Sequence, residues 1–322
     1  MNHLKNIYRQ YYEVIAKYIF PVILFFYPFL TVNQGVDVSD STYSFSNFLF
    51  FERMEGMWVV STYISNVAGW LLTKLPFGTT LLGMKIYATL LVSATVLLVY
   101  FMFCKWMPAW IVFVGELIAV GFCWIPAGIL YNYFSYFLLT LGAILLYQGL
   151  VEEKDRLLIA AGITLGVNVF VRIPNLTQMA LIAGLWYYLA GKHKKINVII
   201  EKTLKCLTGY LTGLAVPLVG VVCQFGFSGI KDMITGLTGI GSTDDTYSIW
   251  SMIVSVLEAY KRTSQWVFLI LIGIALGMAM FFCFRGKWER GKKIIYVCGM
   301  AVLLRFLWGR GMFSFRYYED YT

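Results

Sequence analysis

Two carboxylates and one arginine have the residue types and placement that suggest chemistry. Asp37 and Asp40 follow the first long apolar run of the chain. A carboxylate can take a proton from a hydroxyl, and it can equally cap the amino end of a helix. Arg172 precedes Pro174 at the end of another apolar run. A guanidinium binds phosphate oxygens bidentately, although an arginine at such a boundary can also simply extend toward water.

The composition decides which kind of protein carries these residues. The chain has 322 residues, of which 59% are hydrophobic and 13% are charged. An ordinary soluble domain has about a quarter of its residues charged. The charge is therefore too sparse for a water-exposed surface, which excludes an ordinary soluble enzyme, a disordered chain and a nucleic-acid binder. We expect an all-α integral membrane protein whose residues 1–322 form one polytopic domain.

Apolar runs long enough to cross a bilayer give the expected helices. A span needs roughly 20 apolar residues, and fewer where flanking side chains reach the interface. About nine transmembrane helices are predicted. They lie near 18–32, 80–104, 109–126, 129–150, 157–171, 175–190, 206–226, 266–284 and 294–309.

The basic residues set the expected orientation. With the N-terminus in the cytoplasm and the stretch 58–72 not spanning, the clusters 192–205 and 285–293 fall on the cytoplasmic side, as the positive-inside rule requires. If 58–72 did span, both clusters would lie outside. The first topology is therefore preferred, and it predicts a multi-pass protein of the plasma (cytoplasmic) membrane.

Two long outward segments, 33–57 and 227–265, are predicted to contain interfacial helices. In the first segment, Asp40 is expected to be the N-cap of a helix. Aromatic and apolar residues then repeat at helical spacing and are expected to face lipid. This stripe consists of Phe45, Phe48, Phe51 and Met54.

The first outward segment also carries a motif. It reads Asp37-Val38-Ser39-Asp40-Ser41-Thr42-Tyr43, and Trp58, Tyr63 and a Leu75-Pro76-Phe77-Gly78 turn follow it. This arrangement resembles the GT-C superfamily of polytopic glycosyltransferases, whose first outer loop carries a short acidic motif ending in tyrosine. Aligning that tyrosine on Tyr43 places Ser39 and Asp40 at the two acidic positions. The turn at Arg172 is similar to one in bacterial members of this group.

The resemblance implies a membrane glycosyltransferase that moves a sugar from a polyprenyl-phosphate carrier to an acceptor at the extracytoplasmic face. Asp40 or Asp37 would be the general base, because an inverting transfer needs a carboxylate to deprotonate the acceptor hydroxyl. Positive charge would stabilise the departing lipid phosphate. The expected substrate-binding residues are Arg172, Tyr43, Lys74, Lys261 and Arg262.

Two other classes of function remain possible. A polytopic transporter or lipid flippase would need polar or broken helices at the bilayer midplane, and a non-catalytic membrane subunit is a third class. No cysteine or histidine stands at metal-ligand spacing, so no metal site is predicted. Asp244 and Asp245 could still hold a divalent cation together with Asp40, although a solvated turn is the plainer reading. Members of the resembled group are commonly longer, so the chain is a candidate fragment.

The topology gives a first prediction. A cysteine introduced at His193 should react with a membrane-permeant thiol reagent in intact cells, because the basic cluster around it is expected in the cytoplasm. It should not react with an impermeant reagent added outside. Labelling by the impermeant reagent would reverse the orientation.

Overall fold

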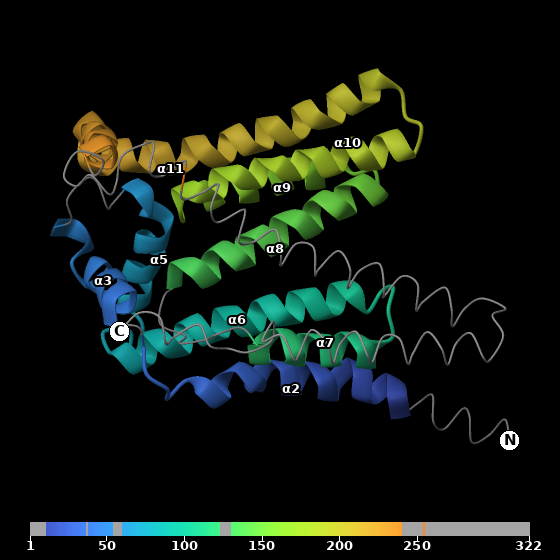
Figure 1. Cartoon of the computed structure of the whole chain (residues 1–322), viewed down its shortest axis with the longest axis horizontal. Coiled ribbons are helices and arrows are strands. Elements are labelled where there is room, and N and C mark those ends of the chain that lie inside the picture. Colours follow the sequence, from blue (N-terminus) through green and yellow to red (C-terminus); the bar gives the residue numbers. More distant parts are fainter. Residues whose placement is uncertain (1–10, 37, 54–59, 123–129, 240–253, 255–322) are drawn as a thin grey trace, which may run out of the picture. The chain divides into compact units, whose positions relative to one another are not determined.

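The computed structural model describes residues 11–36, 38–53, 60–122, 130–239 and 254 (Figure 1). The contacts divide the chain into two units, Met1–Gly239 and Ile240–Thr322. Every described residue except Val254 belongs to the first unit, so the elements below are those of that unit.

The described residues form helices and no strand. In chain order these are η1 (Ile15–Ile19), α2 (Phe20–Phe26), η2 (Tyr27–Thr31), α3 (Val38–Leu49), η3 (Phe51–Arg53), α5 (Tyr63–Thr73), α6 (Leu81–Phe103), α7 (Ala109–Phe122), α8 (Leu130–Val151), α9 (Asp155–Val169), η4 (Ile173–Leu181), α10 (Ile182–Gly191) and α11 (Ile196–Gly239). The expected all-α class is confirmed for this part of the chain.

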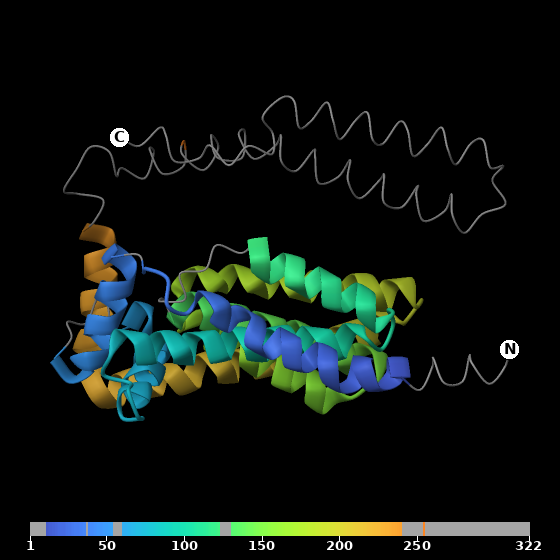
Figure 2. The same cartoon turned by 90° about the horizontal axis from the view of Figure 1, so that it is seen from below.

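The long helices lie side by side in a bundle, and α3 and α5 lie at one end of it (Figures 1 and 2). Hydrogen bonds show that the first helical pass runs antiparallel to α6. The Tyr100 hydroxyl donates to the carbonyl of Ala16 at 2.6 Å, and the Ser93 hydroxyl donates to the carbonyl of Phe25 at 2.8 Å. Short connections after α6, α8 and α10 then return the chain at the opposite end from α3 and α5.

Four helical stretches in the described residues are long and apolar enough to cross a membrane, which is compatible with a membrane-embedded protein. They are Tyr11–Thr31, Leu81–Phe103, Tyr131–Val151 and Ile196–Gly236. Ala109–Gly121 is apolar but shorter. The expected spans at 266–284 and 294–309 lie outside the described residues, so the count of nine stays a prediction.

The stretch 58–72 was expected not to span. Its described part is mainly α5, which has 11 residues and is therefore only about 16 Å long, against a bilayer core of about 30 Å. The expected end of a span at residue 226 coincides with a break inside α11. There Gly226 has φ 67° and ψ −175°, a conformation that glycine adopts without steric cost, and the helix continues in a new direction (Figure 1).

Two expectations about α3 are wrong. The helix begins at Val38, so Asp40 is its third residue rather than its N-cap. The aromatic stripe does not face lipid, because Phe48 is 1% exposed and Phe51 is 3% exposed. Phe48 packs with Met84 and Ala88 of α6, which turns this side of α3 toward the protein. Met54 lies outside the described residues.

Glycines bring α9 and α11 into backbone contact. Gly162 and Gly166 on α9 face Gly209 and Gly213 on α11, so two G-x-x-x-G patterns meet. A Cβ atom added at Gly166 would lie 2.3 Å from the carbonyl oxygen of Tyr210. Small residues at such a crossing allow the close packing that joins helices in lipid.

Ion pairs join the connections at the opposite end of the bundle from α3. Asp155, at the start of α9, accepts hydrogen bonds from Lys202 at 2.5 Å and from Lys205. These bonds hold the pKa of the Asp155 carboxyl below its ordinary value. Lys194 pairs with Glu153 at 2.9 Å. The described basic residues around these connections, which are expected in the cytoplasm, therefore gather at one end, where part of their charge is neutralised.

The glycine contact gives a second prediction. Gly166→Ala should lower the unfolding temperature of the purified protein by several degrees, because overpacking typically costs about 1–3 kcal/mol. Gly184→Ala on α10 is the matched control, since nothing lies within 4 Å of an added Cβ there. Equal melting temperatures for both variants would contradict the close α9–α11 contact.

Candidate functional site

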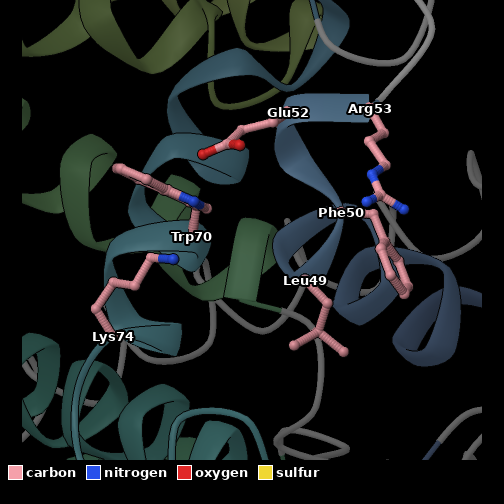
Figure 3. A pocket seen from close by; sticks show the side chains of 6 residues that line it. All are labelled: Leu49, Phe50, Glu52, Arg53, Trp70 and Lys74. Carbon is pink, nitrogen blue, oxygen red and sulfur yellow. The ribbon is translucent and has the colours of Figure 1, made fainter.

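An open pocket of about 270 Å³ lies where α3, η3 and α5 meet. Figure 3 shows Glu52, Trp70 and Lys74 on one side of the hollow, and Phe50 and Arg53 on the other, with Leu49 below. The residues that line it are Leu49, Phe50, Glu52, Arg53, Trp70 and Lys74.

Aromatic packing between α3, η3 and α5 holds the pocket in place. A Cβ atom at Gly69 would lie 2.3 Å from the Phe48 ring, so only glycine leaves room for that ring. Phe51 then contacts Tyr63 and Trp70, with ring centroids 6.2 and 6.1 Å apart. Glu52 and Arg53 follow this buried anchor directly, which places both charged side chains at the pocket.

The pocket combines three kinds of recognition group. The Lys74 ammonium lies 5.1 Å from the centre of the Trp70 ring, a cation–π distance. Glu52 and Arg53 form no ion pair with another described residue. Two cations, one carboxylate and an indole face could together bind a phosphate, accept a proton and stack against a sugar.

Arg172 occupies a different place. It precedes η4 with an extended backbone (φ −160°, ψ 122°), and it is not among the residues that line the pocket. Its guanidinium lies 5.7 Å from the centre of the Tyr131 ring and donates to Oδ1 of Asn132 at 3.5 Å. The structure therefore brings Lys74 together with Glu52 and Trp70, and Arg172 together with the start of α8.

A buried polar network fixes the Arg172 turn. Asn175 donates to the Ser135 hydroxyl at 2.8 Å and to the carbonyl of Asn168 at 2.9 Å. Asn168 is fully buried and donates to Oε1 of Gln178 at 2.8 Å. The last carbonyls of a helix have no partner within it. Asn175 thus supplies a donor for the end of α9 and closes the turn beside Arg172.

The remaining expected site residues are only partly described. Asp37, Lys261, Arg262, Asp244 and Asp245 lie outside the described residues. Asp40 lies in the first turn of α3, and only its backbone is described.

Tyr43 is 43% exposed on α3. Partial burial raises the pKa of its hydroxyl above the ordinary value, and a hydrogen bond with Asn47 opposes that shift. Among the described residues there is also no group of three His, Cys, Asp or Glu side chains that could hold a metal ion.

Several residues at this end of the bundle escaped the sequence analysis. Glu52, Arg53 and Trp70 are not among the site residues that the sequence predicts, although all three line the pocket. Lys85 is a further case. It is 4% exposed near the start of α6 and donates to the carbonyl of Gln34, in the segment that leads into α3. A lysine in an apolar run was the available signal, because intramembrane charges are costly and usually functional.

The chain matches no family model, no curated protein and no solved structure significantly. The fold and the side chains are therefore the basis for any functional proposal.

The polar network gives a third prediction. Asn175→Ala should destabilise the protein by about 1–3 kcal/mol, because it removes the donor that the Ser135 hydroxyl and Oδ1 of Asn168 share. Thr177→Ala, at an exposed residue of η4, should change stability by less than about 0.5 kcal/mol. Chemical unfolding in detergent measures both. A neutral Asn175→Ala variant would show that the network does not hold the turn.

Proposed function

We propose that this chain is a membrane glycosyltransferase that moves a sugar from a polyprenyl-phosphate carrier to an acceptor at the extracytoplasmic face of the plasma membrane. The pocket at α3, η3 and α5 is the observation that supports this function best. It joins phosphate-binding cations, a carboxylate and an aromatic face at the bundle end where the sequence predicts the outer surface.

Each lining group has a role in such a transfer. Lys74 and Arg53 would hold the lipid phosphate and stabilise the charge that builds up on it as the glycosidic bond breaks. The Trp70 ring would stack against the sugar. Glu52 would take the proton from the acceptor hydroxyl as that oxygen attacks the anomeric carbon. The acceptor oxygen thus gains the sugar, and the phosphate leaves with the electron pair.

The depth of the pocket supports the same substrate. A lipid carrier keeps its phosphate at the headgroup level, so the phosphate-binding group must lie at the end of the bundle. Leu49 and Phe50 are 39% and 56% exposed beside the charged residues, which suits an interface between lipid and water.

Three carboxylates are candidates for the base. Asp40, which the sequence favours, stands nine residues before Leu49 in α3, a separation of about 13 Å along the helix axis. Glu52 lines the pocket itself. We therefore propose Glu52 as the base, and Asp40 and Asp37 remain the alternatives that the sequence predicts.

The fourth prediction tests these roles. In proteoliposomes supplied with a panel of tritiated polyprenyl-phosphate sugars, Glu52→Gln should reduce sugar transfer by at least about 100-fold, the usual loss of a general base. Lys74→Met should weaken it as well, because a cation at the departing phosphate is lost. Lys192→Met is the matched control, since Lys192 lies over the Tyr188 ring at 5.9 Å at the opposite end of the bundle.

The outcomes separate the assignments. If Asp40→Asn loses transfer and Glu52→Gln keeps full activity, then Asp40 at the start of α3 is the general base. Full activity in Glu52→Gln, Asp40→Asn and Lys74→Met would remove this pocket as the site of transfer. Substrate-dependent flux without transfer would favour a transporter.

A further inference from the structure

We infer that Arg172 belongs to a separate site, between α8 and η4, that binds the phosphate of an anionic phospholipid. This inference is independent of the proposed transferase, because it rests on a different part of the bundle end. The sequence assigns Arg172 and Lys74 to the same phosphate, but the structure directs the two cations to different neighbours.

The guanidinium of Arg172 is held and still has free donors. The Tyr131 ring lies on one side at 5.7 Å, and Oδ1 of Asn132 accepts from one nitrogen at 3.5 Å. A guanidinium carries five N–H donors. No carboxylate of a described residue pairs with Arg172, so the remaining donors can bind the two non-ester oxygens of a phosphodiester.

The backbone beneath the guanidinium is also fixed. The Arg172 amide donates to the carbonyl of Asn168 at 3.4 Å, and its carbonyl accepts from the Asn175 amide at 2.9 Å. The Asn175 side chain ties this turn to Ser135 of α8. An arginine that merely extends toward water needs neither a ring nor an anchored turn, so this geometry favours a binding role over simple snorkelling.

Exposed apolar residues also stand on η4 and α8, the two elements that flank the Arg172 guanidinium. On η4, Leu176 and Met179 are 52% and 45% exposed. They are three residues apart and therefore share a face of a 3₁₀ helix. On α8, Tyr136 is 58% exposed and stands four residues after Asn132, on the same face. Asn175 and Ser135 join the two elements, so we place the acyl chain of the lipid on these exposed side chains.

The charge of the site selects an anionic lipid. Among the described residues, the contacts of Arg172 are a tyrosine and an asparagine, which are neutral, so nothing there compensates the ammonium group of a zwitterionic headgroup. Phosphatidylglycerol has a phosphodiester and hydroxyls but no cation. Phosphatidylcholine brings its own positive charge toward the guanidinium and should bind more weakly.

The test is a lipid titration of the full chain in detergent, read by native mass spectrometry. The wild type should bind a single molecule of phosphatidylglycerol, and it should bind this lipid more tightly than phosphatidylcholine. Arg172→Gln should weaken that binding by at least about tenfold, because it removes the charge-assisted hydrogen bonds to the phosphate oxygens. Arg172→Lys should bind with intermediate strength, since it keeps the charge and loses the bidentate geometry.

Lys231→Gln is the matched control, because it removes an exposed cation from α11 and should leave binding unchanged. Equal binding by the wild type and Arg172→Gln would overturn the inference, and so would an equal loss in Lys231→Gln. Displacement of the lipid by inorganic phosphate at similar concentration would show that the acyl surface does not matter. Displacement by an equimolar prenyl phosphate would assign Arg172 to the carrier. Melting curves identify any variant that fails to fold. If Arg172→Gln does not fold, the lipid binding of Arg172→Lys is compared with that of the wild type.

Discussion

The close contact between α9 and α11 determines where the candidate sites lie. Because Gly162, Gly166, Gly209 and Gly213 let the two backbones touch, the ends of these helices nearest α5 have fixed neighbours. From there, the carbonyl of Phe170 after α9 accepts a hydrogen bond from the Ile64 amide at 2.9 Å. Gln224 of α11 accepts one from the Tyr63 hydroxyl at 3.2 Å. Both bonds hold the start of α5, and α5 carries Trp70 and Lys74 into the pocket.

Near the Arg172 turn, at the same end of the bundle, buried polar side chains are paired with one another. Buried polar atoms must find partners, since an unpaired one costs about 1–3 kcal/mol. Asn168 and Asn175 supply partners for each other and for Ser135. The needs of these three side chains are met inside the protein, whereas Arg172 and the charged residues of the pocket form no ion pair with another described residue. The polar side chains that hold the structure together are thus different from those that are candidates for binding a ligand.

The sequence predicts the helical class and most helices in the described part because apolar length is a local property. The expected end of a span at residue 226, where the structure has a break in α11, also rests on local composition. What surrounds α3 cannot be predicted from local composition. Phe48 and Phe51 repeat at helical spacing, which predicts one apolar face but cannot say whether lipid or α5 and α6 cover it. Gly69, which leaves room for the Phe48 ring, lies 21 residues further along the chain, and this contact is visible only in the structure.

The candidate site shows the same division. Lys74 and Arg172 stand out in the sequence as cations at helix ends, but their neighbours are set by tertiary contacts. Glu52 and Trp70 carry no local signal that joins them, because Phe51 creates the link by packing on Tyr63 and Trp70. The paired glycines on α9 and α11 were a readable signal, since G-x-x-x-G is a helix-packing motif in membranes.

Photoaffinity labelling with a diazirine-bearing polyprenyl-phosphate sugar tests the central claim most directly, because it locates the headgroup without requiring a known acceptor. The label should attach within 49–53 or 70–74, and excess unlabelled donor should protect both segments. Attachment confined to the opposite end of the bundle, near Asp155 and Lys202, would contradict the claim, as would labelling that unlabelled donor does not reduce.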